Sequence, residues 1–260
     1  MNENLALNPS TTKKSKRAFR WKDPFGHIYL LKRLLIMLIG WATYRLVACV
    51  QKTDIKGLEY LHDLPAENVL FVSNHQTYFM DVIVLFHLFS AAKWGFKDLR
   101  NPLFLLWPRV QSYYVAAEET MKEGGLLPRI FTYAGAVLVK RAFRHKGQEV
   151  RRSADFRAPA KIKKALDSGW VVNFPQGTTG RNAPVRKGSA NLIRALQPIV
   201  VPVKIANFDE AFEKKGLRAK KKGVPIQVVF SPPVTFEPTA TVAEIQEFLE
   251  KHILPDPAKA

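Results

Sequence analysis

The chain alternates short, wholly apolar segments with longer segments of helical pattern, and this alternation constrains its fold more than any other feature. We expect strands over residues 69–73, 93–96, 136–140, 170–174, 199–205 and 225–231. Helical patterns cover residues 79–91, 99–134, 157–168, 187–197 and 243–252. Apolar strands that are separated by helices form largely parallel sheets with right-handed crossovers. The pattern therefore predicts an α/β fold with a mixed, mostly parallel sheet flanked by helices.

Polar residues follow the first of these strands where it should open into a loop. Asn74, His75 and Gln76 come directly after it, and Asp81 lies six residues beyond the histidine. In α/β proteins the chemistry is placed at such strand ends. A histidine with a carboxylate near it can act as a general base whose tautomer the acid fixes. His75 and Asp81 are therefore a candidate catalytic pair, although Asp81 alone could serve the dipole of the following helix.

A second polar turn ends the strand expected at residues 170–174. Its sequence is Phe174-Pro175-Gln176-Gly177-Thr178. A turn bent by glycine offers backbone N–H groups and hydroxyls, which suit an anion or an oxyanion.

Taken in order, these segments resemble the glycerolipid acyltransferase family, and in particular its 1-acylglycerol-3-phosphate acyltransferases. The family signature consists of Asn-His-x4-Asp, Gly-x5-Arg, Phe-Pro-Glu-Gly-Thr and Val-Pro-Val blocks. This chain fills all four in order, with Asn74-His75 and Asp81, Gly135 to Arg141, Phe174 to Thr178, and Val201-Pro202-Val203. The resemblance covers roughly residues 55–205, and four blocks in register are more specific than any one of them.

The chain departs from the family signature at three points. Five residues, not four, separate His75 from Asp81, and Gln176 replaces the glutamate. Thr179 stands where many members carry a phosphate-binding arginine, although Arg181, Arg186 and Lys187 follow it. Glutamine keeps the size of glutamate and one acceptor oxygen and adds donors, so packing and neutral hydrogen bonds survive the change whereas an ion pair does not.

The resemblance implies an O-acyltransferase that moves a fatty acyl group from acyl-CoA or acyl-carrier protein to a lysophospholipid hydroxyl, with 1-acylglycerol 3-phosphate as the first candidate acceptor. His75 would take the hydroxyl proton and Asp81 would hold the imidazole, with neither a metal nor another cofactor. The implied substrate-binding residues are Asn74, Gly135, Arg141, Phe174, Pro175, Gln176, Gly177, Thr178, Arg186 and Lys187. Another lysolipid, such as a lyso-ornithine lipid, and a catalytically silent lipid-binding homologue remain alternatives.

The N-terminal residues predict membrane association. Residues 1–22 carry many lysines and arginines and are expected to be a disordered basic arm. Residues 23–52 are expected to be a membrane-associating helical segment, followed by an acyltransferase domain over 53–260. The apolar run 28–50 has only eleven uncharged residues between Arg33 and Arg45, short of the roughly 20 that a bilayer core needs. We therefore expect a helix in the interface or a re-entrant one, with an ordinary core helix as the alternative.

The tryptophans Trp21 and Trp41 and the tyrosine Tyr44 suit the headgroup level of a membrane. The segment 103–133 is longer than one crossover helix requires, and its apolar side chains would line either a core or an acyl groove.

The formal net charge of +18 requires an acidic partner. An anionic membrane surface fits this requirement, whereas a nucleic acid does not, because no reader motif is present and the aromatic residues lie inside apolar runs. The single cysteine, Cys49, excludes an intrachain disulfide and fits a reducing compartment. No small-residue cleavage pattern follows the run 28–50, so we expect no cleavable signal peptide. These points predict a peripheral or monotopic protein on the cytoplasmic face of the membrane.

Overall fold

The structure is a computed structural model, and it describes residues 21–123, 125–140, 155–181 and 183–255. Seven strands form one sheet in the order β1-β7-β6-β2-β5-β3-β4. The strands are β1 (Lys52–Lys56), β2 (Val69–Ser73), β3 (Ser112–Ala117), β4 (Ala136–Val139), β5 (Trp170–Asn173), β6 (Ile199–Ala206) and β7 (Pro225–Phe230). Every pair of neighbouring strands is parallel except β6 and β7. The expected mixed, mostly parallel sheet is confirmed.

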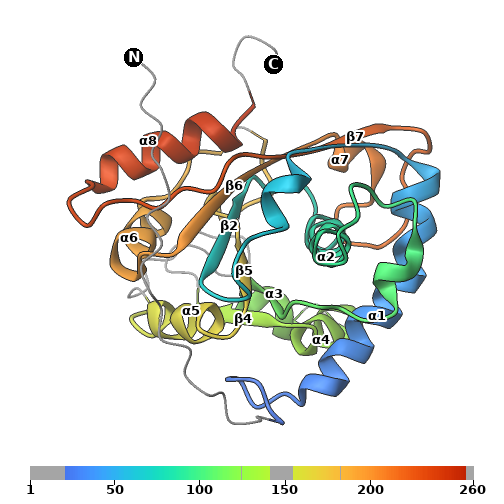
Figure 1. Ribbon diagram of the computed structural model, residues 1–260, viewed down its shortest axis with the longest axis horizontal. Coiled ribbons are helices and arrows are strands. Elements are labelled where there is room, and N and C mark those ends of the chain that lie inside the picture. Colours follow the sequence, from blue (N-terminus) through green and yellow to red (C-terminus); the bar gives the residue numbers. More distant parts are fainter. Residues whose placement is uncertain (1–20, 124, 141–154, 182, 256–260) are drawn as a thin grey trace.

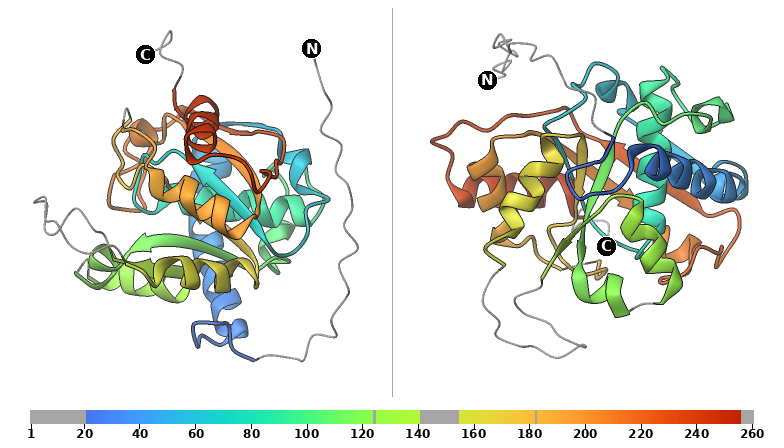
Figure 2. Two further views of the ribbon diagram at one scale, coloured as in Figure 1. Left: turned by 90° about the vertical axis from the view of Figure 1, so that its left-hand side faces the viewer. Right: turned by 90° about the horizontal axis from the view of Figure 1, so that it is seen from below.

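Helices cover both faces of this sheet (Figures 1 and 2). On one face lie α1 (Tyr29–Arg45), α2 (Met80–Lys93) and α4 (Leu126–Tyr133), and on the other lie α5 (Ala158–Leu166), α6 (Lys187–Leu196) and α8 (Val242–Ile253). The shorter helical elements are η1 (Leu46–Val50), η2 (Leu58–Leu61), η3 (Pro102–Leu105), α3 (Glu118–Glu123) and α7 (Phe208–Ala211). A separate hydrophobic cluster fills each face of the sheet, because the central strands are apolar on both sides.

The direction of the connections explains where a site can form. From β2 the chain crosses through α2 on one face to β3, whereas from β5 it crosses through α6 on the other face to β6. The neighbouring strands β2 and β5 therefore send their connections to opposite faces. In α/β sheets, ligands bind in the crevice at such a switch point, beyond the carboxyl ends of the strands.

Two of the expected elements are wrong. Residues 93–96 do not form a strand, since Lys93 ends α2 and Gly95 turns the chain with φ of 81°. The expected helical region 99–134 contains β3 together with η3, α3 and α4. The strand β1 and the short helix α7 were not expected. The other strands and helices expected between residues 69 and 252 are present, with ends that differ by at most two residues, and α1 with η1 occupies residues 29–50 of the expected helical segment 23–52.

Helix α1 turns its polar side toward the protein. The side chains of Lys32, Thr43 and, just beyond η1, Gln51 are buried, with 1%, 2% and 5% exposure. Lys32 Nζ lies 3.3 Å from the centre of the Tyr113 ring. Burial lowers the pKa of Lys32 to about 7, with Asp23 opposing the shift. These polar side chains thus face the protein and not the solvent.

The outward side of α1 is apolar. Leu30, Leu31, Leu34, Leu38 and Trp41 are all exposed, with Leu38 at 62%. Beside α1, the η3 region exposes Leu103, Leu106 and Trp107. By length and composition the helix over Tyr29–Val50 is long and apolar enough to cross a membrane, a test that core helices and signal sequences also pass.

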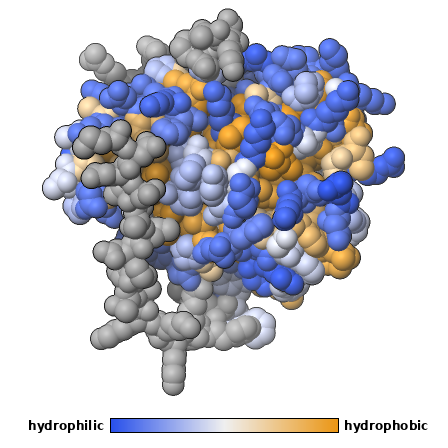
Figure 3. Space-filling model, turned by 45° about the horizontal axis from the view of Figure 1, so that its top comes forward, coloured by the Kyte–Doolittle hydropathy of each residue, from blue (hydrophilic) through white to orange (hydrophobic). Residues whose placement is uncertain are grey.

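Other parts of the surface are more polar. On the face seen in Figure 3, hydrophilic side chains predominate and hydrophobic ones gather toward the middle. The expected boundary between the segments 23–52 and 53–260 falls inside β1, which pairs with β7, while residues 1–20 of the expected basic arm lie outside the described part of the chain.

Candidate active site

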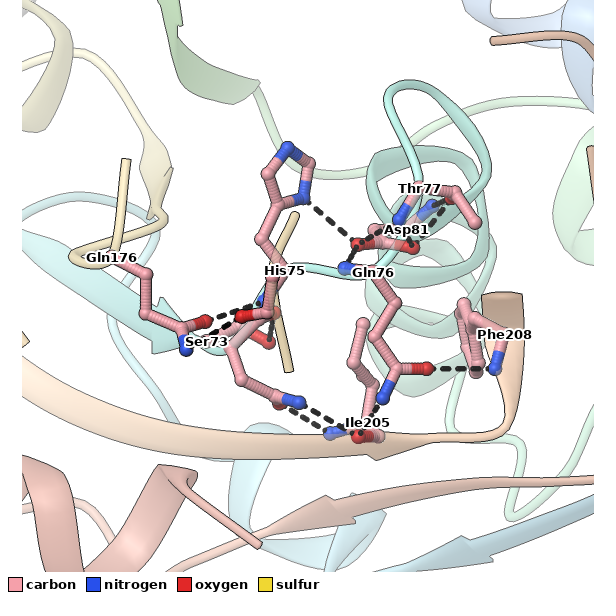
Figure 4. Close-up of polar contacts among 10 residues, drawn as sticks. Ser73, His75, Gln76, Thr77, Asp81, Gln176, Ile205 and Phe208 are labelled. Carbon is pink, nitrogen blue, oxygen red and sulfur yellow. Dashed lines mark hydrogen bonds and ion pairs between the residues drawn. The ribbon is translucent and has the colours of Figure 1, made fainter. Parts of the chain in front are cut away.

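His75 and Asp81 meet at the carboxyl end of β2. His75 Nδ1 lies 2.9 Å from Asp81 Oδ2, so the six-residue separation brings the two side chains into direct contact. Figure 4 shows the imidazole standing above the turn, with its other nitrogen pointing away from the aspartate. That nitrogen, Nε2, has no hydrogen-bond partner among the described residues. The histidine side chain is 14% exposed and the aspartate is fully buried.

The turn before α2 surrounds the Asp81 carboxylate with donors. The backbone N–H of Gln76 donates to Oδ2 at 2.6 Å, and that of Thr77 donates to both oxygens at 3.0 and 3.1 Å. The Thr77 hydroxyl donates to Oδ1 at 2.6 Å. With the histidine included, four groups fix the carboxylate. The Asp81 carboxylate is thereby oriented to accept the Nδ1 proton of His75, which leaves Nε2 free to act as a base.

Helix α2 begins at Met80, and Phe79 occupies the N-cap position. The Thr77 hydroxyl accepts a hydrogen bond from the Asp81 N–H at 3.2 Å. The residues from Gln76 to Phe79 thus supply the extra length that the unusual spacing requires.

Two buried amides attach the His75 turn to β6. Asn74 exchanges a pair of 2.8 Å hydrogen bonds with the backbone of Ile205. Gln76 donates to the Ile205 carbonyl at 3.2 Å and accepts from the Phe208 N–H at 2.8 Å (Figure 4). These contacts place Asn74 in a structural position, pointing away from the cleft toward the neighbouring strand.

The turn from Phe174 to Thr178 follows β5 and packs against His75. The Phe174 ring stacks on the imidazole with 4.1 Å between ring centres. Gly177 adopts φ of 64°, a left-handed conformation that glycine tolerates without strain. Phe174, Pro175, Gly177 and Thr178 all line the same cleft as His75.

Gln176 is buried beneath this turn, with 1% exposure. Its side-chain oxygen accepts from the His75 N–H at 3.1 Å, and its amide nitrogen donates to the Ala183 carbonyl at 2.7 Å and the Gly180 carbonyl at 3.3 Å. The amide oxygen thus joins the two turns, and the amide nitrogen holds the loop that follows Gln176. This geometry assigns Gln176 a role in positioning His75, while its neighbours in the turn reach the cleft.

A cleft of about 740 Å³ lies over the carboxyl ends of the central strands. It contains His75 and extends on one side to Tyr78, Phe79 and Val82 at the start of α2. On the other side it extends between α5 and α6, along Ile162 and Leu192. The cleft therefore has a branch over each face of the sheet, with the imidazole between them.

An apolar crevice adjoins the branch near α2. It has a volume of about 30 Å³ and is lined by Ile36 and Gly40 of α1, Phe104 of η3 and Phe131 of α4. Val82 and Tyr114 line both the crevice and the cleft. The segment 103–133, for which the sequence left a core and an acyl groove open, contributes residues to the core and to the walls of the crevice and the cleft.

Besides Asn74 and Gln176, three more of the expected substrate-binding residues do not line the cleft or lie outside the described residues. Gly135 directly precedes β4 and therefore lies at the amino ends of the strands, away from the cleft. A Cβ at this position would lie 2.6 Å from the Ser112 carbonyl oxygen. Any larger residue at position 135 would collide with this oxygen, so close packing explains the glycine. Arg141 lies outside the described residues, directly after Lys140, which lines the cleft. Arg186 lines the cleft, and the exposed Lys187 beside it does not.

Arg181, the first arginine after the Phe174–Thr178 turn, is held away from the cleft. Its guanidinium bonds both oxygens of Asp209 at 2.7 and 2.8 Å and Glu210 at 3.0 Å. These hydrogen bonds raise the pKa of Arg181 and lower that of Asp209. The arrangement ties the turn to α7 and leaves Arg181 engaged with two carboxylates.

Sequence reasoning missed several residues of the site. Gln76 and the Thr77 hydroxyl were not assigned, although both stand within the Asn-His-x-x-x-x-x-Asp block. Arg194 and Asn191 of α6, which line the far branch, carried no sequence signal beyond their position on a predicted helix.

The fold and the site together define an α/β enzyme with a histidine–carboxylate pair at the switch point of its sheet. Comparison with protein families gives the family itself: residues 52–206 match the model of the acyltransferase family. The chain belongs to this family and is an acyltransferase. No curated protein matches it in sequence.

Among solved structures, the chain is similar to the 1-acyl-sn-glycerophosphate (LPA) acyltransferase PlsC from Thermotoga maritima. The two share 19% sequence identity and a TM-score of 0.53, over 83% of this chain and 74% of the other. This likeness supports the fold.

Proposed function

We propose that this acyltransferase works at a membrane surface and transfers a fatty acyl group from an acyl thioester to the free hydroxyl of a lysophospholipid, with 1-acylglycerol 3-phosphate as the acceptor. The observation that carries the proposal is the His75–Asp81 pair in a cleft whose α2 branch adjoins the apolar crevice beside α1. The structural neighbour whose name includes LPA acyltransferase is consistent with it.

In the proposed mechanism, His75 Nε2 removes the proton from the acceptor hydroxyl as that oxygen attacks the thioester carbonyl carbon. The tetrahedral intermediate then collapses, the C–S bond breaks, and the thiolate takes the proton from the imidazolium. The products are an ester and a free thiol. Asp81 orients the imidazole and offsets its charge while the proton is held.

Membrane association is proposed from the apolar side of α1. A soluble helix normally turns its leucines inward, but here Lys32 and Thr43 face the protein while Leu34 and Leu38 face outward. An interfacial helix buries such a side in the acyl region of a leaflet, and nearby basic residues would bind anionic headgroups. Because the crevice lies directly under α1, the acyl chain of a membrane lipid would have a short path to the cleft.

A different lysolipid acceptor remains a second candidate because of one observation. Thr179 replaces the arginine that many relatives carry, and the nearest following arginine, Arg181, is engaged by Asp209 and Glu210. The phosphate of lysophosphatidic acid would then depend on Arg186 in the cleft and on the expected contact with Arg141.

Measurement of transfer from one acyl donor to lysophosphatidic acid and to its dephosphorylated monoacylglycerol tests the acceptor. We expect a strong preference for the phosphorylated acceptor in the wild type. Arg141→Ala should reduce that preference about tenfold or more, because a charge-assisted contact contributes roughly 1.5–3 kcal/mol. If the wild type were equally active on both acceptors, lysophosphatidic acid would be refuted as the substrate. If Arg141→Ala lost the same activity on both acceptors, Arg141 would not bind the acceptor phosphate.

A further inference from the structure

The branch of the cleft between α5 and α6 is not explained by the acceptor or by the catalytic pair. Its floor is apolar, formed by Val139, Ile162 and Leu192, and Asn191 and Arg194 stand on its α6 edge. The helix α6 begins just after the Phe174–Thr178 turn. Gly188 and Arg194 both line the cleft, and the six helical steps from one to the other span about 9 Å. The branch is therefore a groove that leads from the site toward a guanidinium.

Arg194 is available for a ligand. Its guanidinium forms no hydrogen bond or ion pair with the part of the chain that the structure describes, in contrast to Arg181, which binds two carboxylates. Lys140 and Arg186 add positive charge to the same cleft.

The one carboxylate among the described residues that line the cleft is Asp155. Burial opposes its charge, but hydrogen bonds from the backbone N–H groups of Lys140 and Arg157 and the nearby Lys161 hold its pKa below the ordinary value. The carboxylate is thus already satisfied, and the unpaired guanidinium of Arg194 favours an anionic ligand.

The position of this branch separates it from the lipid side of the molecule. Helix α1, with its exposed leucines, covers one face of the sheet, whereas α5 and α6 cover the other (Figure 1). The reaction needs one substrate that resides in the membrane and one whose carrier is soluble in water. The α5–α6 branch opens on the face away from α1, which suits the soluble carrier.

We propose that the α5–α6 branch binds the phosphopantetheine arm of the acyl donor and that Arg194 binds a phosphate at the end of that arm. The proposal rests on the proposed acyl transfer from a thioester. Such an arm has a thioester at one end, two amides along its length and a phosphate at the other end. The apolar floor suits the hydrocarbon parts of such an arm, the amide of Asn191 suits its amides, and the guanidinium of Arg194 suits its phosphate.

The test compares three donors that carry the same acyl chain: acyl-CoA, acyl-carrier protein and acyl-pantetheine, which lacks the phosphate. For Arg194→Gln we expect KM to rise about tenfold for the two phosphorylated donors, since a charge-assisted contact is lost. The KM for acyl-pantetheine, the KM for the lysophospholipid and kcat at saturating donor should not change. Lys164→Gln, which removes one charge from the outer side of α5, is the matched control and should behave as the wild type in all these assays.

An equal rise of KM for acyl-pantetheine, or no rise for acyl-CoA and acyl-carrier protein, would overturn the assignment. A rise for acyl-CoA alone would also overturn it, because it would place Arg194 on a phosphate that the carrier protein lacks. A second variant, Ala195→Trp, fills the groove without changing charge, and it should raise KM for all three donors but not for the lysophospholipid.

Direct binding separates this proposal from the identity of the acceptor. The affinity of desulfo-coenzyme A is measured by calorimetry in a His75→Ala background, where no transfer is needed. Addition of Arg194→Gln should weaken binding about tenfold. Unchanged affinity would refute the donor site even if lysophospholipid acylation were established, whereas weakened binding would support it even if the acceptor proved to be another lipid.

Discussion

At the scale of single residues, His75 is the group on which the proposed chemistry depends. His75→Ala removes the base, so we expect transfer to fall at least 10²- to 10⁴-fold, the range typical of general acid–base groups. The variant should still fold and bind vesicles, because Asp81 keeps its donors from Gln76 and Thr77 when it loses the imidazole. A purified His75→Ala protein that turned over at nearly the wild-type rate would disprove the mechanism. Asp81→Asn should also be severely impaired, since its oxygens accept from four groups.

Gln176 offers a second test at this scale. Gln176→Glu restores the residue of the family signature, but in this chain the Gln176 amide nitrogen faces the carbonyls of Ala183 and Gly180. A carboxylate there loses both donors, so we expect a loss of stability of about 1–3 kcal/mol and a lower transfer rate. Thermal unfolding and initial rates measure these effects. A variant as stable and as active as the wild type would show that the turn tolerates the negative charge.

The sequence predicted the His75–Asp81 contact because the pair belongs to a motif whose spacing can be read directly. It could not predict the donors around Asp81, since two of them are backbone N–H groups whose direction depends on the turn. The role of Gln176 was equally hidden, because its partners Gly180 and Ala183 are set by the loop conformation. Catalytic roles for His75 and Asp81 stay predictions until variants are assayed.

At the scale of elements, α1 gives the clearest experiment. Leu38→Gln with Trp41→Gln should reduce binding to anionic vesicles by tenfold or more, because each apolar side chain contributes up to about 1.5–3 kcal/mol when fully buried. Tyr60→Gln, which alters an exposed aromatic residue away from α1, is the control and should bind normally. High salt should weaken binding without abolishing it. Complete release by salt alone would contradict an apolar anchor.

Strands and helices were predictable where the apolar pattern was unambiguous, as in β2, β5 and β6. The prediction of a helical region over 99–134 was wrong, because this segment holds four short elements, η3, β3, α3 and α4, and no single hydrophobic period extends through all of them. The strand β1 was missed because it lies at the edge of the sheet and alternates exposed and half-buried residues, with Asp54 among them. The outward direction of the α1 leucines depends on what packs beneath the helix, and the sequence alone does not contain that information.

At the scale of the whole molecule, the buried Lys32 links stability to pH. Its pKa in the folded protein is about 7, below the 10.5 of an exposed lysine, so the unfolded chain binds more protons between these values. Stability of the wild type should therefore rise as pH increases from 7 toward 10. Lys32→Met removes the buried charge and should raise the melting temperature most at pH 6, with the difference shrinking toward pH 10. Lys56→Met, at an exposed lysine, is the control, and its melting temperature should follow that of the wild type at every pH. If Lys32→Met raised the melting temperature by the same amount at all pH values, the assignment to Lys32 would be contradicted.

The pairing of β1 with β7 has a consequence for how the molecule is made. Lys52 lies opposite Pro225, so this edge of the sheet can close only after some 170 further residues have left the ribosome. Helix α1, directly before β1, is synthesised long before that closure. During this interval its leucines can meet a bilayer while the sheet on which α1 will pack does not yet exist. Synthesis beside a membrane would therefore let α1 settle in the lipid first, and the acyltransferase domain would fold against a helix already in place.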